Sequence, residues 1–596
     1  MPDSLQEHLK ALFGYNSFRD SQEQIIKTLL AGRDVLAILP TGAGKSLCYQ
    51  LPAMLLPGIT LVVSPLISLM QDQVVSLSKN GLSAAFLNSS LPLEEVRNIM
   101  QNLSQHKILY IAPERFADKE FLAELQKTPV SLFAIDEAHC ISQWGHAFRL
   151  DYRQLSLLKK LFPKVPIIAL TATATAEVEK DILLQLAMKD PFVAKTSFDR
   201  PNLTLRVYPK KDALTQVCDF LDKYEGKPGI IYSATRDSVD DMYDQLKKKG
   251  LSVGKYHAGL SSAKRAEAQH DFVYGELSLI VATVAFGMGI HKPDIRFIIH
   301  LDMPQSIEQY YQEIGRAGRD GLASECLMLY SPKELLVYDF FLGKITDPVL
   351  RKKTKEKTEK IKALCHSSLC RRVGLLSYFG ETFPVTFCNG CDNCLDDTEL
   401  FSETINAQKI LSCVYKLRGN FSISHVINVL LGIPSQEILE NGQEQLSTFG
   451  LMKDLSRSTL HDFIYSLIQL GFLIETKEEK PLLQWSPTSG DVIKGIKEVL
   501  IRKKIRKAKY GVALVKAKYD KKLFALLTEL RQKLAKRFRE PTHVIFGDQT
   551  LIEMSQTYPT TRDAMMMLNG FSPLKWEKYG ILFCKVIVDY VKKTKS

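Results

Sequence analysis

One stretch of eight residues, Leu39-Pro-Thr-Gly-Ala-Gly-Lys-Ser46, constrains the fold of this chain more than any other. It follows an apolar run at residues 35–38, which predicts a short buried strand, and a helical pattern at residues 46–55 follows it. A strand, a glycine-rich turn and a helix in this order are the context of a phosphate-binding loop. Gly42 and Gly44 allow the backbone to turn tightly and to point N–H groups at phosphate oxygens.

Three further side chains of this loop stand where a bound nucleotide needs them. Lys45 is expected to reach the β and γ phosphates, and Ser46 to place its hydroxyl on Mg²⁺. Thr41 is a further candidate contact to the nucleotide. The consensus pattern begins with glycine where this chain has Leu39, so a glycine-containing structural turn is the alternative at this point.

Length and composition place the chain among ordinary globular proteins. A length of 596 residues indicates roughly four domains, and 24% charged residues argue against a disordered or fibrous chain. No apolar run approaches the length of about 18 residues that a membrane-spanning helix needs. The first residues have neither the basic nor the apolar region of a signal peptide.

Charge and cysteine content suggest two kinds of partner. The net charge is +12, and residues 518–596 hold 15 Lys and Arg against 8 Asp and Glu, a surplus of 7. This surplus indicates either a polyanion partner or only a solvated basic face, and charge alone does not separate the two. The 11 cysteines are an odd number in a long chain, which favours reduced thiols and a metal site.

The segment before the phosphate loop contains candidate contacts for a nucleotide base. The amide of Gln22 can both donate to and accept from an adenine edge. Tyr15 can stack on the base, and Arg19 lies between them in the sequence. The alternative for Gln22 is an ordinary surface glutamine.

An acidic pair follows a predicted buried strand at residues 132–135. Strand and helix patterns alternate through this region as they do in βαβ units. In such a chain Asp136 is expected to hold Mg²⁺, and Glu137 to orient and deprotonate the attacking water. A lone Asp-Glu pair is usually only solvated, but this pair follows a phosphate loop.

A second α/β pattern begins near residue 205 and ends in an arginine-rich segment. Gly287 and Gly289 lie in a flexible glycine-rich stretch and are further candidate contacts to the nucleotide. Arg316 and Arg319 are three residues apart, so both can face one site. Planar guanidinium groups suit the charge that develops on a γ-phosphate, although surface arginines on a helix are the alternative.

The residues directly after Asp136-Glu-Ala-His139 identify a family. The sequence Cys140-Ile-Ser-Gln-Trp-Gly-His-Ala-Phe-Arg149 resembles the aromatic-rich loop of RecQ helicases, within helicase superfamily 2. That resemblance implies a loop that couples single-stranded DNA to ATP hydrolysis. Trp144 and Phe148 offer stacking platforms for bases, and His146 and Arg149 offer donors to the DNA backbone. Aromatic residues packed into a core are the alternative.

The resemblance also implies an architecture and a site. The fold class is α/β, with two RecA-like parallel-sheet lobes that hold ATP in the cleft between them. Arg319 corresponds to the arginine finger, with Arg316 and Gln312 beside it. The family loop has an acidic residue where this chain has Ala147 and a proline where it has Leu150.

Four cysteines, Cys370, Cys388, Cys391 and Cys394, supply the ligands of a closed tetrahedral zinc site. An iron–sulfur cluster also uses four cysteines, so the chemistry alone leaves both metals open. The family resemblance of Arg371-Arg372 and of residues 375–381 favours zinc. A site with four protein ligands has no open position, so this metal is structural.

The remaining sequence resembles the family's accessory domains, a winged-helix domain and a C-terminal helical HRDC domain. The HRDC hairpin appears here as Asn569-Gly-Phe-Ser-Pro573. The expected division is lobe 1 at residues 1–204, lobe 2 at 205–342, a small zinc-binding helical segment at 343–400, the winged helix at 401–494, a basic linker at 495–517 and the HRDC domain at 518–596.

The sequence therefore predicts an ATP-dependent DNA helicase that uses ATP, Mg²⁺ and Zn²⁺. By resemblance it moves 3′ to 5′ on single-stranded DNA, unwinds duplex DNA in recombination and repair, and contacts a single-stranded-DNA-binding protein through its winged helix. No membrane partner is expected. The expected location is the cytoplasm at the nucleoid in a bacterium, which the domain set suggests, or the nucleus in a eukaryote. Two alternatives are a DNA-binding scaffold or strand-annealing protein whose ATP site only switches conformation, and a helicase that acts on RNA.

Overall fold

The structure is a computed structural model that describes residues 4–79, 81–88, 91–142, 149–287, 290, 292–331, 338, 342–367, 369–381, 387–395, 398–476, 482–504 and 519–595. The chain divides into two compact units. The first comprises Met1–Leu203, Tyr208–Glu334 and Leu514–Ser596, and the second Thr204–Val207 and Leu335–Ala513. None of the described helices is long and apolar enough to cross a membrane.

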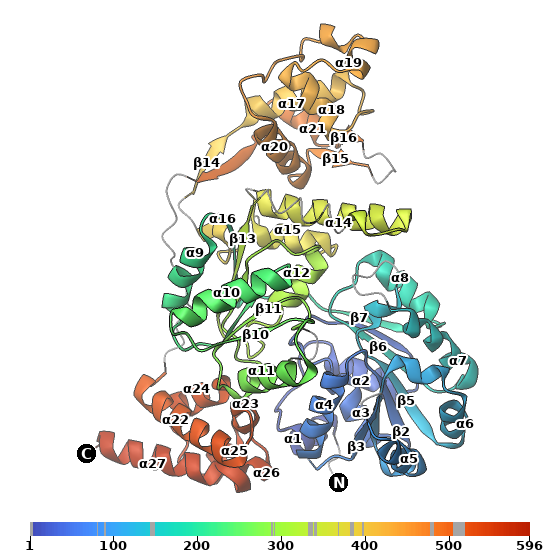
Figure 1. Ribbon diagram of the computed structural model, residues 1–596, viewed down its shortest axis with the longest axis vertical. Helices are drawn as coiled ribbons and strands as arrows, with labels where there is room; N and C mark the ends of the chain where they lie inside the picture. The colour runs from blue at the N-terminus through green and yellow to red at the C-terminus, as the bar shows by residue number, and fades with distance from the viewer. Residues whose placement is uncertain are drawn as a thin grey trace. The chain divides into compact units, whose positions relative to one another are not determined.

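Lobe 1 is built on a parallel sheet of seven strands in the order β3-β4-β2-β5-β6-β1-β7 (blue to teal in Figure 1). Its central strands are short apolar runs buried on both faces, as expected where helices cover both sides of a sheet. The strands are β1 (Val35–Ile38), β2 (Ile59–Val63), β3 (Ala84–Leu87), β4 (Ile108–Ile111), β5 (Val130–Ile135), β6 (Ile167–Thr171) and β7 (Phe192–Lys195). The helices are α1 (Leu5–Phe13), α2 (Gln22–Leu30), α3 (Leu47–Leu55), α4 (Ile67–Lys79), α5 (Leu93–Gln101), α6 (Lys119–Lys127), α7 (Leu158–Leu161) and α8 (Ala176–Gln185).

The strand order of lobe 1 creates one functional edge. Strands β5, β6 and β1 are neighbours, with Ile38 beside Thr171 and Ile135 beside Ala169 in the parallel ladders. The segments that follow these three strands therefore emerge at the same edge of the sheet. They carry the phosphate loop, the acidic pair and the turn that begins at Thr171.

Lobe 2 contains a second sheet, with the order β10-β11-β9-β12-β13-β8 (green in Figure 1). Its strands are β8 (Leu203–Pro209), β9 (Gly229–Tyr232), β10 (Val253–Tyr256), β11 (Leu279–Ala282), β12 (Phe297–His300) and β13 (Ser324–Tyr330). Its helices are α9 (Ala213–Leu221), α10 (Arg236–Lys248), α11 (Ser262–Tyr274) and α12 (Ile307–Ile314). The ladders joining β10, β11, β9, β12 and β13 are all parallel, so the prediction of two RecA-like parallel-sheet lobes is confirmed.

The C-terminal part of the first unit is helical (red in Figure 1), as the HRDC prediction requires. A buried core that includes Leu527, Leu551 and Phe583 holds its helices together, and Phe546 stacks on Phe571 with ring centroids 4.4 Å apart. The helices are α22 (Lys521–Phe538), α23 (Thr542–Ile545), α24 (Asp548–Thr557), α25 (Arg562–Met566), α26 (Pro573–Lys575) and α27 (Ile581–Lys595).

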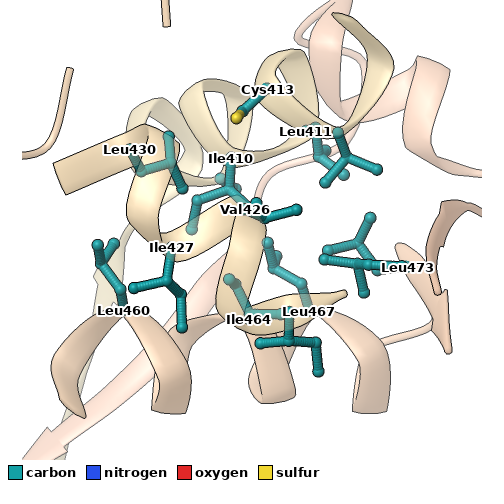
Figure 2. Packing of buried hydrophobic residues seen from close by; sticks show 14 of the residues in the cluster. Ile410, Leu411, Cys413, Val426, Ile427, Leu430, Leu460, Ile464, Leu467 and Leu473 are labelled. Carbon is teal, nitrogen blue, oxygen red and sulfur yellow. The ribbon is translucent and has the colours of Figure 1, made fainter. Parts of the chain in front are cut away.

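The second unit contains the cysteine segment and the predicted winged helix. Figure 2 shows Ile410 of α17, Val426 of α18, and Ile464 and Leu467 of α20 directed toward one another in a shared core. Full burial of one such side chain contributes about 1.5–3 kcal/mol, so this core holds the three helices as one body. The elements are α14 (Pro348–His366), α15 (Arg371–Tyr378), α16 (Asp392–Leu395), β14 (Thr398–Ser402), α17 (Thr404–Lys416), α18 (Ile423–Leu431), α19 (Gln436–Glu440), α20 (Arg457–Gln469), β15 (Leu473–Glu475), β16 (Leu483–Trp485), α21 (Ser489–Ile493) and β17 (Leu500–Lys504).

One domain assignment needs correction. Residues 495–517 were expected to form a basic linker, but residues 500–504 form β17, which pairs antiparallel with β14 from Ser402↔Leu500 to Thr398↔Lys504. The high lysine and arginine content of this segment did not indicate a strand, and the strand that it pairs with lies about a hundred residues earlier. Residues 505–518 lie outside the described part of the chain.

Candidate nucleotide site and metal centre

The phosphate loop has the local structure that its sequence predicted. It connects β1 to α3, and Gly42 and Gly44 have φ angles of 90° and 79°, in the left-handed region that favours glycine. A Cβ atom at position 44 would lie 2.6 Å from Nε2 of Gln22, so a side chain there would displace the Gln22 amide from the loop. Lys45 donates from Nζ to the Leu39 carbonyl at 3.3 Å. Burial lowers the pKa of Lys45, while nearby Glu137 and Asp136 raise it.

The segment before the loop contacts the loop backbone. Gln22 is buried, and its Nε2 donates to the carbonyls of Ala43 and Gly44 at 3.0 and 3.1 Å. Its Oε1 accepts the backbone N–H of Arg19 at 2.9 Å, and Arg19 Nη1 donates to the Gly42 carbonyl at 2.8 Å. Gln22 is therefore not a surface glutamine: its amide is bonded to the phosphate loop.

The other candidate nucleotide contacts lie in or before the same loop. Tyr15 is 46% exposed, so its ring is accessible to a base. Thr41 and Ser46 are half-buried, and Ser46 is the residue directly before α3.

The acidic pair lies at the end of β5, on the same sheet edge as the loop. The Glu137 N–H donates to Asp136 Oδ1 at 3.0 Å, and the Asp136 N–H donates to the Val63 carbonyl at 2.9 Å. Burial, with the like charge of Glu137, raises the pKa of Asp136 to about 7, while Lys45 opposes this shift. Glu137 has φ 48°, a left-handed conformation that costs a non-glycine residue roughly 1–3 kcal/mol. Such strain persists at sites where the surrounding structure holds a side chain in one direction.

A buried histidine connects the acidic pair to the next strand. His139 Nδ1 lies 3.0 Å from Thr171 Oγ1 and 3.3 Å from Glu137 Oε2. Thr171 Oγ1 donates to the Thr173 carbonyl and accepts the Thr173 N–H. The hydroxyl-rich turn after β6 is thus joined to Glu137 through one imidazole. The sequence signalled the acidic pair but not this connection.

The arginines of lobe 2 face the phosphate loop. A Cβ atom built on Gly42 would lie 3.4 Å from Cγ of Arg319, so the two residues are in contact. Arg319 Nη1 donates to the Ile290 carbonyl at 2.8 Å, and Arg316 donates to the Gly287 carbonyl. Burial and the neighbouring Arg316 and Arg200 lower the pKa of Arg319. The structure therefore brings Arg316, Arg319 and Gly287 together beside the loop.

Lobe 2 contains two further residues that the sequence predicted for the nucleotide site. Gln312 is half-buried on α12, four residues before Arg316 in the sequence. Gly289 lies outside the described residues.

Most of the aromatic loop also lies outside the described residues, including Trp144, His146, Phe148 and Ala147. Arg149 is described. Its Nη1 donates to the Pro65 carbonyl at 2.9 Å, and its N–H donates to the Cys140 carbonyl at 3.0 Å. The end of this loop is thus tied to the segment after β2 on one side and to the acidic motif on the other.

The predicted HRDC hairpin contacts lobe 1 within the first unit. Asn16 Nδ2 donates to the Met567 carbonyl at 3.0 Å and to Asn569 Oδ1 at 3.3 Å. A Cβ atom at Gly14 would lie 2.9 Å from the Phe571 carbonyl oxygen. In this conformation the hairpin lies against the segment that leads to Arg19 and Gln22.

The metal ligands lie together in the second unit. The sulfur atoms of Cys370, Cys388, Cys391 and Cys394 all lie within 4.8 Å of one another, the only such group among the described residues. The Cys370 and Cys391 sulfurs are 3.9 Å apart. Tetrahedral Zn–S bonds of about 2.3 Å place sulfurs roughly 3.8 Å apart, so the four thiols fit zinc.

A buried ion pair supports these ligands, and sequence reasoning missed its acidic partner. Arg371 donates from Nε and Nη2 to the two carboxylate oxygens of Asp392 at 3.0 and 3.1 Å. Asn393 donates from Nδ2 to the carbonyls of Ser367 and Leu369 at 2.8 and 2.6 Å. The available signal was an acidic residue directly after Cys391 and an arginine directly after Cys370.

A phosphate loop in one lobe that faces arginines of a second lobe defines a nucleotide-dependent motor of the helicase class. Matches to protein families follow the chain in order: DEAD/DEAH box helicase at residues 19–182, helicase conserved C-terminal domain at 210–321, RecQ zinc-binding at 337–395, RQC domain at 398–510 and HRDC domain at 520–587.

Curated relatives match nearly the whole chain. A Haemophilus influenzae protein named ATP-dependent DNA helicase RecQ is 41% identical over 98% of this chain and 95% of its own length. A Bacillus subtilis protein of the same name is 40% identical over 99% of both chains. An Acanthamoeba polyphaga mimivirus protein named as an ATP-dependent RNA helicase is 38% identical over 79% of this chain and 88% of its own. The chain belongs to the RecQ family of helicases and is an ATP-hydrolysing enzyme.

Proposed function

We propose that this enzyme is an ATP-dependent DNA helicase that moves 3′ to 5′ on single-stranded DNA and unwinds duplex DNA in recombination and repair. The observation that carries the proposal is the contact between the phosphate loop of lobe 1 and Arg319 of lobe 2. Because the two lobes share one site, ATP binding and hydrolysis can change their separation. DNA as substrate is supported by the bacterial relatives' names, and the direction by family resemblance.

Each side chain of the site has a proposed role in hydrolysis. Lys45 binds the β and γ phosphates, and Glu137 orients the attacking water and accepts its proton. Arg319 stabilises the charge that develops on the γ-phosphate, with Arg316 and Gln312 beside it. Mg²⁺ held by Ser46 and Asp136 would neutralise phosphate charge.

The base-binding segment has a further role before hydrolysis. Tyr15 stacks on adenine, and Arg19 and Gln22 bind the base edge. Their present bonds to the loop carbonyls must then be shared or exchanged when nucleotide binds. Thr41, Gly42, Gly44, Gly287 and Gly289 complete the proposed nucleotide contacts.

The accessory regions have proposed roles outside hydrolysis. Trp144, His146, Phe148 and Arg149 contact single-stranded DNA and license hydrolysis, and the winged helix holds the duplex and binds a single-stranded-DNA-binding protein. Zinc, when bound by the four cysteines, supplies folding energy rather than chemistry. We place the protein at the nucleoid of a bacterium and retain the division into domains given above, with the winged-helix body at residues 398–504 and the linker reduced to residues 505–517.

The test is strand separation driven by ATP. Duplexes with a 3′ tail, a 5′ tail or a blunt end are compared, and only the 3′-tailed DNA should be unwound efficiently. Equal unwinding of the 5′-tailed DNA would refute the direction. ATP binding without unwinding of any duplex would favour the scaffold or strand-annealing alternative. An RNA duplex is included because one relative is named as an RNA helicase.

A further inference from the structure

The segment between the two lobes contains an arginine that no sequence pattern singled out. Arg200 lies between β7 of lobe 1 and β8 of lobe 2, in Phe198-Asp-Arg-Pro-Asn202. The segment is anchored next to it, because the Tyr311 hydroxyl on α12 donates to the Phe198 carbonyl at 2.9 Å. Its position gives the Arg200 guanidinium access to backbone of both lobes.

The Arg200 guanidinium donates hydrogen bonds to backbone carbonyls of both lobes. Nη1 donates to lobe 1 at the Thr41 carbonyl, 2.8 Å away, and lies 3.4 Å from the Gly315 carbonyl of lobe 2. Nη2 donates to lobe 2 at the carbonyls of Ala317 and Gly318, at 2.9 and 3.0 Å. A planar guanidinium is suited to such a contact, because its donors diverge from one rigid fork.

The two groups of carbonyls belong to the two halves of the nucleotide site. Thr41 is a phosphate-loop residue, and residues 315–318 form the turn that carries Arg316 and leads directly to Arg319. The backbones are also close, because a Cβ atom at Gly315 would lie 3.0 Å from Cβ of Thr41. Arg200 is half-buried at this junction, and desolvation lowers the pKa of its guanidinium.

We propose that Arg200 is a positioning residue for ATP hydrolysis, which ties the phosphate loop to the turn that presents Arg316 and Arg319. Its hydrogen bonds fix the position of the turn relative to the phosphate loop. Arg316 and Arg319 therefore lie against the bound phosphates only when the loop is in place. The inference rests on the proposed function, because it assigns a role within ATP hydrolysis. It differs from a purely structural role, since its effect falls on the catalytic step rather than on ATP binding.

Asn202 provides a matched control in the same segment. Its Nδ2 donates to the carbonyls of Gly318 and Leu322, both at 2.9 Å. Asn202 thus holds the same turn through one shared carbonyl, but these bonds do not reach lobe 1. The comparison separates the connection between lobes from simple support of the turn.

The experiment measures kcat and KM for ATP with saturating single-stranded DNA, using the full chain. Arg200→Ala should lower kcat by roughly 100-fold, the loss expected from about 1 Å of misplacement. KM should change less than about threefold, because Lys45 and Ser46 still bind the phosphates. Arg200→Lys should lose similar activity, because a single ammonium nitrogen cannot reproduce the two-nitrogen fork that reaches the Thr41 carbonyl and the carbonyls of Ala317 and Gly318 together. Asn202→Ala should lower kcat at least about tenfold less than Arg200→Ala does, because it loosens the turn but leaves the bond to lobe 1 in place.

Chemical rescue gives a second readout that a folding defect would not produce. Millimolar guanidinium ion should restore part of kcat in Arg200→Ala, but not in Arg200→Lys, where the side chain fills the site. An unchanged kcat in Arg200→Lys, a loss confined to KM, or an equal loss in Asn202→Ala would overturn the proposal. If Arg200→Ala does not fold, Arg200→Lys decides by itself. Absence of ATPase in the unaltered chain would instead overturn the proposed function.

Discussion

Loss of the carboxylate behind the cysteine cluster should open the metal site. Asp392→Asn leaves the Arg371 guanidinium buried without its charged partner, since the two side chains are only 6% and 0% exposed. Removing one member of a buried ion pair costs about 3–5 kcal/mol. Asp392 directly follows Cys391, and Arg371 directly follows Cys370. The loss of the ion pair therefore destabilises the two backbone segments that hold these two ligands.

The magnitude converts into a rate of zinc release. If zinc leaves through a locally opened state, a cost of 3–5 kcal/mol raises the population of that state by roughly 150- to 5,000-fold. Elemental analysis should first find one zinc per chain, and none after Cys391→Ser. Release is then followed with a chromogenic chelator. This measurement suits the chain better than one melting temperature, since multidomain proteins do not unfold in a single step.

Two variants make the zinc test specific. Glu359→Gln removes the carboxylate of a half-buried pair on α14 that is not next to a cysteine ligand, and whose Nζ–Oε2 distance to Lys362 is 3.1 Å. It should change the rate less than about fivefold. The double variant Arg371→Met with Asp392→Leu removes both charges and should release zinc more slowly than Asp392→Asn. Release at the wild-type rate from Asp392→Asn would refute the reasoning, and so would iron in the elemental analysis.

Three further predictions concern the motor and its DNA contacts. Lys45→Ala should abolish ATP hydrolysis while DNA binding survives; near-normal hydrolysis would remove the phosphate-loop assignment. Deletion of residues 518–596 should weaken DNA binding and flatten the log–log salt dependence by about 0.7–0.9 per lost phosphate contact, and an unchanged slope would mean that these charges do not meet DNA. Trp144→Ala or Phe148→Ala should keep basal ATPase but lose most stimulation by single-stranded DNA, because base stacking worth about 1–3 kcal/mol no longer acts on the loop. Full stimulation in both variants would place the coupling elsewhere.

The features that the sequence predicted are those encoded by adjacent residues. The phosphate loop needs glycines at fixed places and a strand and a helix on either side, and all of these lie between Val35 and Leu55. The acidic pair likewise needs only the strand before it. Their meeting at one sheet edge depends on β5, β6 and β1 being neighbours, which the βαβ pattern favours without fixing the order.

The features that escaped prediction depend on backbone acceptors distant in sequence. Gln22 and Arg200 both donate to carbonyls of the phosphate-loop region, and every residue carries a carbonyl, so no residue type marks the partner. The sequence therefore suggested an adenine contact for Gln22 without its bonds to the loop, and no role for Arg200. Asp392 differs, because its position between two predicted ligands was a usable signal.

The paired strands β14 and β17 show how pairing at a distance also moves a domain boundary. β14 enters the winged-helix region before α17, and β17 leaves it after α21, so both ends of this body belong to one antiparallel ladder. A boundary at residue 494 would remove β17 and leave the backbone groups of β14 without their ladder partners. The N–H and C=O groups on that edge of β14 could then form hydrogen bonds only with water. The basic residues of 500–504 therefore belong to the folded body that begins at Thr398.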